Sequence, residues 1–273
     1  MGAMTAIKTG DNPRLSKALI QGVCLGAAIA ALAFRPAAAE ESASPSTTAA
    51  ASTALPVTQA SITSKRADFD GAEAPSDVRQ AADWVVASGN NRGMAFVIVE
   101  KPKAMVFAFD PNGKILGKAP CLVGLQPGDD SAPGVGTMTL AQIGPDMRTT
   151  PAGRFVASLG RDLTKNDVLW VDYPDAISLH RVINTVPAER RPERLASPTP
   201  LEHRISWGCI NVPKAFFDKV IEPTFTGTSG VVYILPEIKT MREVFPTYRD
   251  VDEPSPLQNV NLTTPSSSEA VGQ

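Results

Sequence analysis

The sequence predicts a mainly β domain with one or two short helices. From residue 94 onward, short apolar runs alternate with turn-forming residues, which is typical of strands connected by turns. Only two segments show the spacing of three and four residues that indicates an amphipathic helix. The 273 residues, 43% of them hydrophobic, suffice for one medium-sized globular domain with further segments at its ends. We expect this domain at residues 92–236.

The first predicted element is a short helix at residues 76–89. Ser76 is suited to cap its first turn, and Gly89 with Asn90 is suited to end it. The apolar residues between them recur at helical spacing: Val78, Ala81, Ala82 and Val85.

Strands are expected next, in runs bounded by charged or turn-forming residues. Asp110-Pro111-Asn112-Gly113 is a strong turn signal between two of these runs. Residues 124–146 are rich in Gly, Pro and Asp, so we expect them to be irregular. A second helix is expected at 213–221, with a proline in its first turn and with Phe216, Phe217 and Val220 facing inward. The predicted strands are 94–100, 104–110, 114–123, 153–159, 168–172, 176–180 and 230–235.

Residues 1–39 have the three-part pattern of a secretory signal peptide. Basic residues precede an almost uncharged apolar stretch at 18–34, and Ala37-Ala38-Ala39 provides small residues for cleavage. Cys24 is unsuited to lipidation, because Val23 precedes it where a lipoprotein signal needs a small residue. We expect export to a bacterial periplasm, with a retained N-terminal membrane anchor as the alternative.

Two further segments flank the predicted domain. Residues 40–75 are rich in Ser, Thr, Ala and Pro and have few large apolar side chains, so we expect a disordered linker. Residues 237–273 are interpreted as a C-terminal extension with a polar tail. Removal of residues 1–39 leaves 22 basic and 27 acidic residues, a net charge of −5. The chain therefore lacks the basic footprint of a nucleic-acid-binding protein.

Cys209 is the candidate nucleophile. A cysteine kept for packing usually lies in an apolar run, whereas Cys209 lies in a polar turn. Gly208 frees the backbone just before the sulfur, and Ser206 and Asn211 offer hydrogen bonds around it. This setting predicts a reactive thiol, provided that a base lies within reach.

An imidazole is the usual means of lowering the pKa of a thiol. His180 ends the apolar run 176–180 and is the expected base, and His203 is the alternative base. Cys121 lies in a strand-like run, so we expect it to be a buried free thiol, which leaves Cys209 unpaired. The chain has no metal-type cluster of Cys and His, and we expect neither a metal nor an organic cofactor.

Three motifs follow one another along the chain. They are Thr150-Pro151-Ala152-Gly153-Arg154-Phe155, Leu179-His180 and Ser206-Trp207-Gly208-Cys209-Ile210-Asn211. In combination they resemble the L,D-transpeptidase catalytic-domain family of bacterial cell-wall enzymes. The resemblance extends over residues 93–236, more than half of the chain that remains after the signal peptide.

The resemblance implies a mostly β, sandwich-like fold and a cysteine acyl-enzyme that needs no metal or organic cofactor. Cys209 would be the nucleophile and His180 its base. Ser206 and Gly208 would belong to the turn that presents the sulfur, and the backbone N–H of Cys209 would stabilise the oxyanion. Thr150 is expected to shape a turn near the cleft.

The sequence departs from the family pattern at three positions. Arg181 stands where the family usually has glycine, Trp207 where it often has histidine, and Asn211 where arginine is frequent. An amide does not replace the charged fork of a guanidinium in binding a carboxylate. Residues 181–205 are longer than in the family, and we interpret them either as a lid that restores positive charge near the substrate or as a solvated surface loop. This insert contains five arginines: Arg181, Arg190, Arg191, Arg194 and Arg204.

The activity that the resemblance implies is that of an exported peptidoglycan L,D-transpeptidase with a part in cell-wall organisation and cell shape. Its thiol would form a thioester with a stem tetrapeptide and pass the acyl group to an amine. That amine would belong to another stem peptide, or to a lysine of an outer-membrane lipoprotein or another protein. The alternatives are an L,D-carboxypeptidase or endopeptidase of the same fold, and a catalytically inactive cell-wall-binding module.

Overall fold

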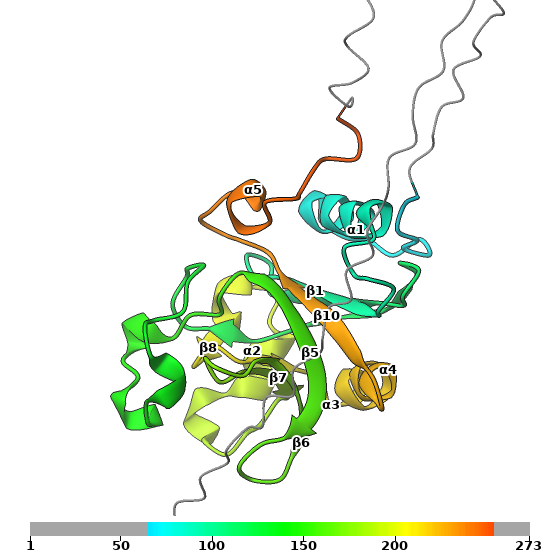
Figure 1. Cartoon of the computed structure of the whole chain (residues 1–273). Helices are drawn as coiled ribbons and strands as arrows, with labels where there is room; N and C mark the ends of the chain where they lie inside the picture. The colour runs from blue at the N-terminus through cyan, green and yellow to red at the C-terminus, as the bar shows by residue number, and fades with distance from the viewer. Residues whose placement is uncertain (1–64, 254–273) are drawn as a thin grey trace, which may run out of the picture. The chain divides into compact units, whose positions relative to one another are not determined.

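The computed structural model describes residues 65–253 (Figure 1). The predicted signal peptide and most of the predicted linker lie outside the described residues, as does the end of the polar tail. The described part is mainly β, as predicted: it has an eight-stranded mixed sheet, a two-stranded sheet and several short helices. Within residues 65–253, no helix is both long enough and apolar enough to cross a bilayer.

The large sheet has the strand order β3-β2-β1-β10-β5-β6-β7-β9. Most neighbours are antiparallel, but β1 pairs with β10, and β7 with β9, in parallel. The small sheet pairs β4 (Val123–Gly124) with β8 (Arg204–Ser206), also in parallel. The strands of the large sheet are β1 (Phe96–Glu100), β2 (Met105–Phe109), β3 (Ile115–Pro120), β5 (Gly153–Arg161), β6 (Asp167–Asp172), β7 (Ile177–Arg181), β9 (Ile210–Val212) and β10 (Ser229–Ile234).

Strand β1 is a continuous apolar run because it serves two cores. Val97 and Val99 belong to one core, and Phe96 and Ile98 belong to the other. All four are fully buried, as expected for a strand that is covered on both faces. In Figure 1, α1 (Ser76–Ser88) and α5 (Met241–Val244) lie together on one side of β1 and β10. Helices α3 (Lys214–Phe216) and α4 (Glu222–Phe225) lie on the other side. The sheet is thus covered on both faces, which fits the predicted sandwich-like fold.

Helix α1 confirms the first predicted element. Gly89 ends it in the left-handed conformation, with φ of 64° and its N–H directed at the carbonyls of Val85 and Val86. The start differs from the expectation, because Pro75 is the N-cap residue and Ser76 is already helical. No side chain caps this first turn.

The second predicted helix begins after Pro213 but extends beyond residue 221. It consists of α3 (Lys214–Phe216), a π-helical turn at Phe217–Ile221 and α4 (Glu222–Phe225). The proline of α4, Pro223, follows directly after the π-helical turn, and the helical backbone continues through it. The expected inward residues pack on the first core: Phe216, Phe217 and Val220.

Residues after 237 pack on the domain although their sequence shows no periodicity. Thr240 caps the four-residue helix α5 with its side chain. Phe245 is buried against Trp84 of α1, with ring centroids 5.6 Å apart, and the Trp84 indole N–H donates to a backbone carbonyl at 3.0 Å. Arg66 pairs with Asp252 at 2.5 Å, so the first and last described segments meet.

The segments between the predicted strands contain short elements. Residues 124–146 are irregular, as expected, with three 3-10 turns. The insert at 181–205 holds α2 (Arg191–Ala196) between two further 3-10 turns, Pro187–Glu189 and Pro200–His203. Strands β8 and β9, on either side of Cys209, were not predicted, because each has only three residues.

A buried polar cluster fastens the irregular segment 124–150 to the sheet. The ammonium group of Lys101, at the end of β1, is fully buried and lies 2.7 Å from a carboxylate oxygen of Asp129. It also donates to the carbonyl oxygens of Gly128 and Thr150. Asp129 in turn accepts three backbone N–H groups from residues 237–239. The ion pairs of Lys101 with Asp129 and, at 3.5 Å, with Glu237 therefore join β1, the irregular segment and the C-terminal segment.

Candidate functional site

Cys209 lies at the end of a tight turn between β8 and β9. Gly208 has φ of 125°, and a Cβ at this position would lie 2.7 Å from the carbonyl oxygen of Thr149. Only glycine therefore fits directly before the sulfur. Cys209 and Cys121 are both free, as predicted; Cys121 is buried, whereas Cys209 is partly exposed.

Thr150 and Ser206 hold this turn from two sides. The Thr150 hydroxyl donates to the carbonyl of Gly208 at 2.7 Å and accepts the N–H of Gly124 at 2.8 Å. The Ser206 hydroxyl accepts the N–H of Gly208 at 3.1 Å. Both hydroxyl-bearing residues are almost fully buried, so these hydrogen bonds are shielded from water. They have the turn-shaping place that the sequence predicts for them.

We expect Thr150→Val to lower the free energy of unfolding by about 1–3 kcal/mol, because it removes one donor and one acceptor from a buried site. It should also slow alkylation of Cys209, since the carbonyl of Gly208 loses its anchor. Urea denaturation and alkylation rates measure the two effects. Thr149→Val is the matched control, because within residues 65–253 the Thr149 hydroxyl makes no hydrogen bond. Equal losses in both variants would contradict the anchoring role of Thr150.

Three groups approach the sulfur of Cys209. The His180 imidazole lies near enough to the thiol to lower its pKa. The Ser178 hydroxyl lies 3.6 Å from the sulfur, and the carbonyl oxygen of Ala176 lies at the same distance. Ser178 and His180 are two residues apart on β7, so their side chains point to the same face of the strand. The structure thus brings together the two residues of the predicted pair, Cys209 and His180.

The thiol and the imidazole shift each other's pKa. Burial alone would raise the pKa of the Cys209 thiol, but the nearby His180, together with Ser178, lowers it below the ordinary value. Burial would likewise lower the pKa of His180, but Cys209 raises it above the ordinary value. Both shifts favour a thiolate beside an imidazolium. By contrast, burial raises the pKa of Cys121, which makes that thiol unreactive.

We expect His180→Gln to move the midpoint of Cys209 alkylation to higher pH. In the unsubstituted protein the lowered pKa keeps the thiolate present below the ordinary thiol pKa of about 8.5, and it is lost as the pH falls through that lowered value. Without the imidazole, burial dominates, so the rate at pH 7 should fall at least about tenfold. Rates of iodoacetamide alkylation between pH 5 and pH 10 measure the midpoint.

The control is His203→Gln in the same assay, with folding checked by circular dichroism. Both ring nitrogens of His203 lie 2.9 Å from backbone carbonyl oxygens, those of Cys121 and Ser197. His203 is buried and fastens the insert to the core, so the structure offers no support for it as the alternative base. A midpoint that moves with His203→Gln and stays with His180→Gln would reverse this assignment.

The side chain of Arg181, next to the base, points away from the sulfur. Its guanidinium pairs with Asp218 at 2.5 Å and with Glu222 at 2.9 Å, and it lies over the ring of Phe217. Only its backbone carbonyl takes part in the site, because it lies 2.7 Å from Nδ1 of His180. The resembled family usually has glycine at this position. The arginine fits here because the helical segment 214–225 binds its side chain.

Asn211 and Trp207 face two arginines. Asn211 is fully buried and lies between Arg191 of the insert and His180. The guanidinium carbon of Arg148 lies 4.4 Å from the centroid of the Trp207 ring, and that of Arg191 lies at 5.9 Å. The indole N–H of Trp207 is buried and has no hydrogen-bond partner among residues 65–253. Two cations thus lie close to the turn that carries Cys209.

The insert contributes one arginine to the site. Arg190 is exposed, and Arg194 donates to the carbonyls of Glu189 and Glu202 within the insert itself. Arg191 is buried and reaches Asn211. The insert therefore contributes Arg191, whose guanidinium pairs with Glu189 of the same insert and reaches Asn211.

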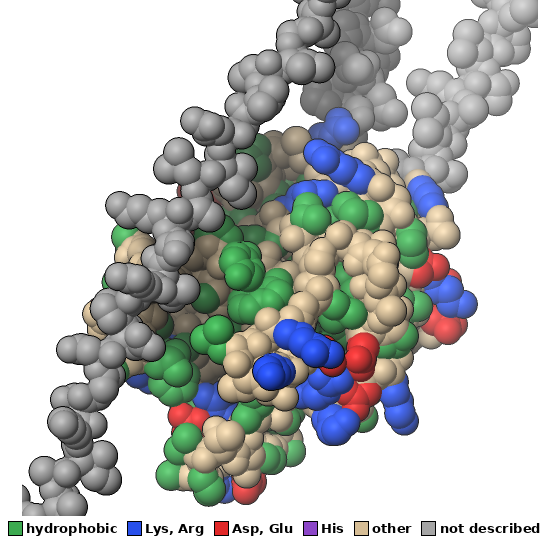
Figure 2. Space-filling view, turned by 60° about the horizontal axis from the view of Figure 1, so that its bottom comes forward, with side chains coloured by type: hydrophobic (Ala, Val, Ile, Leu, Met, Phe, Trp, Pro, Cys, Tyr) green, Lys and Arg blue, Asp and Glu red, His purple; other side chains and the backbone are tan. Residues whose placement is uncertain are grey.

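A cavity of about 370 Å³ lies beside His180. Carboxylate, cationic and amide side chains line it, together with His180 and three apolar residues. The lining residues are Asp162, Asn166, Asp167, Val168, His180, Arg181, Val182, Ile183, Asn184 and Lys214. In Figure 2, Lys and Arg side chains lie beside Asp and Glu side chains near the edge of the face shown, while the middle of that face is largely hydrophobic and uncharged. This cavity is therefore adjacent to the predicted pair, because His180 is one of its lining residues.

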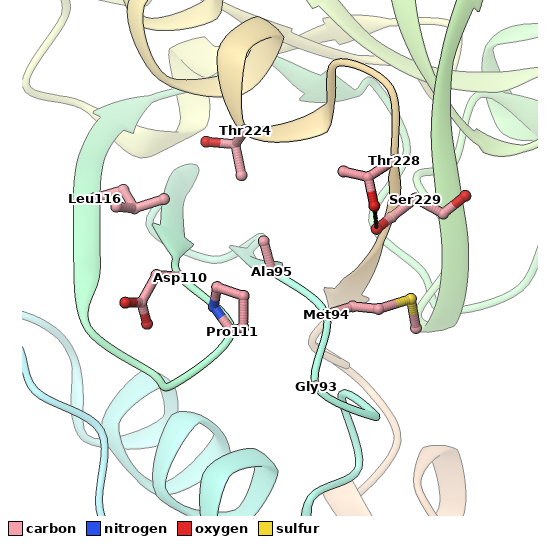
Figure 3. A pocket seen from close by; sticks show the side chains of 9 residues that line it. All are labelled: Gly93, Met94, Ala95, Asp110, Pro111, Leu116, Thr224, Thr228 and Ser229. Carbon is pink, nitrogen blue, oxygen red and sulfur yellow. Dashed lines mark hydrogen bonds between the residues drawn. The ribbon is translucent and has the colours of Figure 1, made fainter.

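A second cavity of about 310 Å³ lies elsewhere in the fold (Figure 3). Asp110 and Pro111 of the β2–β3 turn face Thr224 and the Thr228–Ser229 segment across it. Asp110 is its one ionisable lining residue, and that carboxylate already accepts backbone N–H groups from its own turn. Nothing in this lining is arranged for catalysis, and within residues 65–253 no cluster of metal-binding side chains occurs.

Sequence reasoning missed three residues of the site. Ser178 could have been found from strand alternation, because it lies two residues before the predicted base. Arg148 gave no signal, since it lies in the irregular segment. Arg191 was noted only as one of five arginines in the insert, and nothing in the sequence distinguished it from Arg190.

No family model matches the sequence, and no curated protein is similar to it. Several solved structures are similar to this chain at low identity. An L,D-transpeptidase from Xylanimonas cellulosilytica is 12% identical, with a TM-score of 0.33, and the match covers 52% of this chain and 60% of that one. The helical cell shape determining protein Pgp2 from Campylobacter jejuni is 14% identical, with a TM-score of 0.35 and coverage of 54% and 49%.

The catalytic domain of the L,D-transpeptidase from E. faecium is 15% identical, with a TM-score of 0.29, and the match covers 52% of this chain and 96% of that domain. The chain thus spans about half to three fifths of the length of the first two structures. At these scores the similarity does not itself support an activity, which has to be argued from the site. The solved structures to which this chain is similar are L,D-transpeptidase catalytic domains from several bacteria, matched at low identity over about half of its length.

Proposed function

We propose that the protein is an exported peptidoglycan L,D-transpeptidase with Cys209 as its nucleophile. The observation that carries this proposal is the pairing of Cys209 with His180 on the neighbouring strand β7, in which the pKa of the thiol is lowered and that of the imidazole is raised. The pair lies at a turn where Gly208 leaves the sulfur partly exposed. An accessible, activated thiol beside a base is the arrangement that covalent acyl transfer requires.

In the proposed reaction, the Cys209 thiolate attacks the carbonyl between the L-centre of a diamino acid and a terminal D-Ala of a stem tetrapeptide. The backbone N–H of Cys209 stabilises the oxyanion. The C–N bond then breaks, and His180 gives its proton to the departing amine of D-Ala. A thioester remains on Cys209.

In the second step, the acceptor amine attacks the thioester and loses a proton to His180. The C–S bond breaks, a new amide forms, and the thiolate is regenerated. The acceptor is the amine of another stem peptide, or a lysine of an outer-membrane lipoprotein or another protein. The cavity of about 370 Å³ beside His180 lies next to the proposed base, which supports its use by an acceptor amine.

Mass spectrometry of the intact protein after incubation with a stem tetrapeptide, or with a carbapenem, tests the proposal. We expect the mass of one acyl group to appear on Cys209. Released D-Ala without cross-linked product would indicate hydrolysis, as in a carboxypeptidase. Tight binding of muropeptides without any adduct would indicate a binding module and would overturn the proposal. Fractionation of the expressing bacterium, with detection in the periplasm, tests the proposed export.

A further inference from the structure

The side-chain amide of Asn211 lies between Arg191 and His180. Its Oδ1 is 2.6 Å from Nη1 of Arg191, and its Nδ2 is 3.2 Å from Nε2 of His180. Asn211 and His180 are register partners on the parallel strands β9 and β7, so their side chains lie next to each other on one face of the sheet. Asn211 is completely buried, so water does not compete for these contacts.

Arg191 fixes the orientation of the amide. A guanidinium only donates hydrogen bonds, so the atom that faces it must be the amide oxygen. The amide NH₂ group is therefore directed at His180. Rotation of the amide by 180° would place an NH₂ group against the guanidinium and leave two donors facing each other in a buried site, which is unfavourable.

The backbone fixes the tautomer of His180. Nδ1 lies 2.7 Å from the carbonyl oxygen of Arg181, which only accepts, so Nδ1 carries a proton. In the neutral imidazole, Nε2 then has a lone pair that accepts the N–H of Asn211. Protonation of Nε2 would set its N–H against the NH₂ group of Asn211. Arg191 donates to Asn211, and Asn211 donates to His180. Each donor in this series therefore faces an acceptor only when Nε2 is unprotonated.

Most of the charged groups near His180 are ion-paired, and Arg191 itself pairs with Glu189, whereas Asp162 accepts hydrogen bonds from its own turn. The cavity beside His180 is lined by four further ionisable side chains. Of these, Asp167 pairs with Arg161, and Arg181 and Lys214 share Asp218. Burial and, less strongly, the charge of Arg191 disfavour protonation of His180, whereas Cys209 favours it. The four ionisable side chains of the cavity are Asp162, Asp167, Arg181 and Lys214.

We propose that Arg191 is a positioning residue that acts through Asn211 to keep Nε2 of His180 in its proton-accepting form. When the S–H bond of Cys209 breaks and an Nε2–H bond forms, the amide of Asn211 cannot accept that proton. The imidazolium is then stabilised by the sulfur and by the backbone carbonyl of Arg181 but not by Asn211, and it returns the proton readily to a leaving amine. Through Arg191, the insert therefore determines how readily a proton moves between Cys209 and His180. The proposal rests on the proposed roles of Cys209 and His180.

The test is the pH dependence of iodoacetamide alkylation at Cys209, resolved from Cys24 and Cys121 by peptide mass spectrometry. In Arg191→Met, the amide is free to turn its oxygen toward His180 and accept from the imidazolium. We expect the alkylation midpoint to move to lower pH by about one unit, the size of effect that one hydrogen bond to a charged group produces. Arg191→Lys keeps a donor for Oδ1 and should stay close to the unsubstituted protein.

Arg190→Met is the matched control, because Arg190 precedes Arg191 in the same insert and is exposed. It should leave the midpoint unchanged. If Arg191 only supported the local structure, its removal would separate the thiol from the imidazole and move the midpoint to higher pH. That result, or an unchanged midpoint in Arg191→Met, would overturn the proposal. An unsubstituted protein with an ordinary thiol midpoint would instead contradict the proposed function itself.

Discussion

Replacement of Cys209 by alanine is expected to abolish covalent adduct formation completely. The proposed acyl-enzyme is a thioester, and Cys209 is the free, partly exposed thiol among the described residues whose pKa is lowered. No neighbouring group can take its place, because Ser178 is a buried hydroxyl without a base of its own. Intact-mass measurement after incubation with a carbapenem or a stem tetrapeptide should show the unmodified mass at all times.

Cys121→Ala is the matched control for this result. Cys121 is buried in the first core, and burial raises the pKa of its thiol, so it should not react with either reagent. The Cys121→Ala protein should therefore form the adduct at the rate of the unsubstituted protein, corrected for any loss of folded material. An adduct on Cys209→Ala, or loss of the adduct in folded Cys121→Ala, would place the nucleophile elsewhere.

The largest expected loss of stability follows from Lys101→Met. The substitution retains the length of the side chain but removes the buried ammonium group, which leaves the Asp129 carboxylate without its ion-pair partner. Breaking a buried ion pair by removing one partner costs about 3–5 kcal/mol. The free energy of unfolding, measured by urea denaturation at pH 7, should fall by that amount. Lys103→Met is the control, because Lys103 lies exposed in the same turn and should change it by less than about 0.5 kcal/mol.

The same ion pair predicts a specific acid sensitivity. Burial would raise the pKa of Asp129, but Lys101 and the backbone N–H groups of residues 237–239 hold it at about 2. Because the folded-state pKa is lowered, the stabilisation is fully present above the ordinary carboxyl pKa of about 3.9 and is lost as the pH falls toward 2. In Lys101→Met, part of this lowering disappears, so acid unfolding should begin at higher pH. Identical acid transitions in both proteins would contradict this account.

Most of the fold could be predicted from the sequence because its long strands are apolar runs between turn signals. Strands β1, β2 and β10 are buried on both faces, and helix α1 has a regular apolar stripe and a terminal glycine. The three-residue strands β8 and β9 have too few residues to show a pattern. The segment after residue 237 packs through scattered large side chains, and such packing leaves no periodicity in the sequence.

The site, like the fold, has one part that could be predicted from the sequence and one part that could not. Cys209, Gly208 and Ser206 are adjacent in the sequence, so their turn could be predicted from local chemistry. The contact between Arg191 and Asn211 depends on how the insert returns to the sheet, which no local pattern encodes. The direction in which Arg181 points depends on carboxylates of a helical segment more than thirty residues away. The sequence indicated the residue types of the site, but it did not indicate which residues far apart in the chain are in contact.

The side chains of Arg66 and Asp252 form an ion pair, so the two ends of the described segment lie next to each other. A short linker could therefore join residue 252 to residue 66, and new termini could be opened at the exposed tip of the β5–β6 hairpin, residues 163–165. Such a circular permutant would retain both cores and the Cys209 turn. Its activity would show whether the hairpin beside the cavity must be continuous for an acceptor to bind.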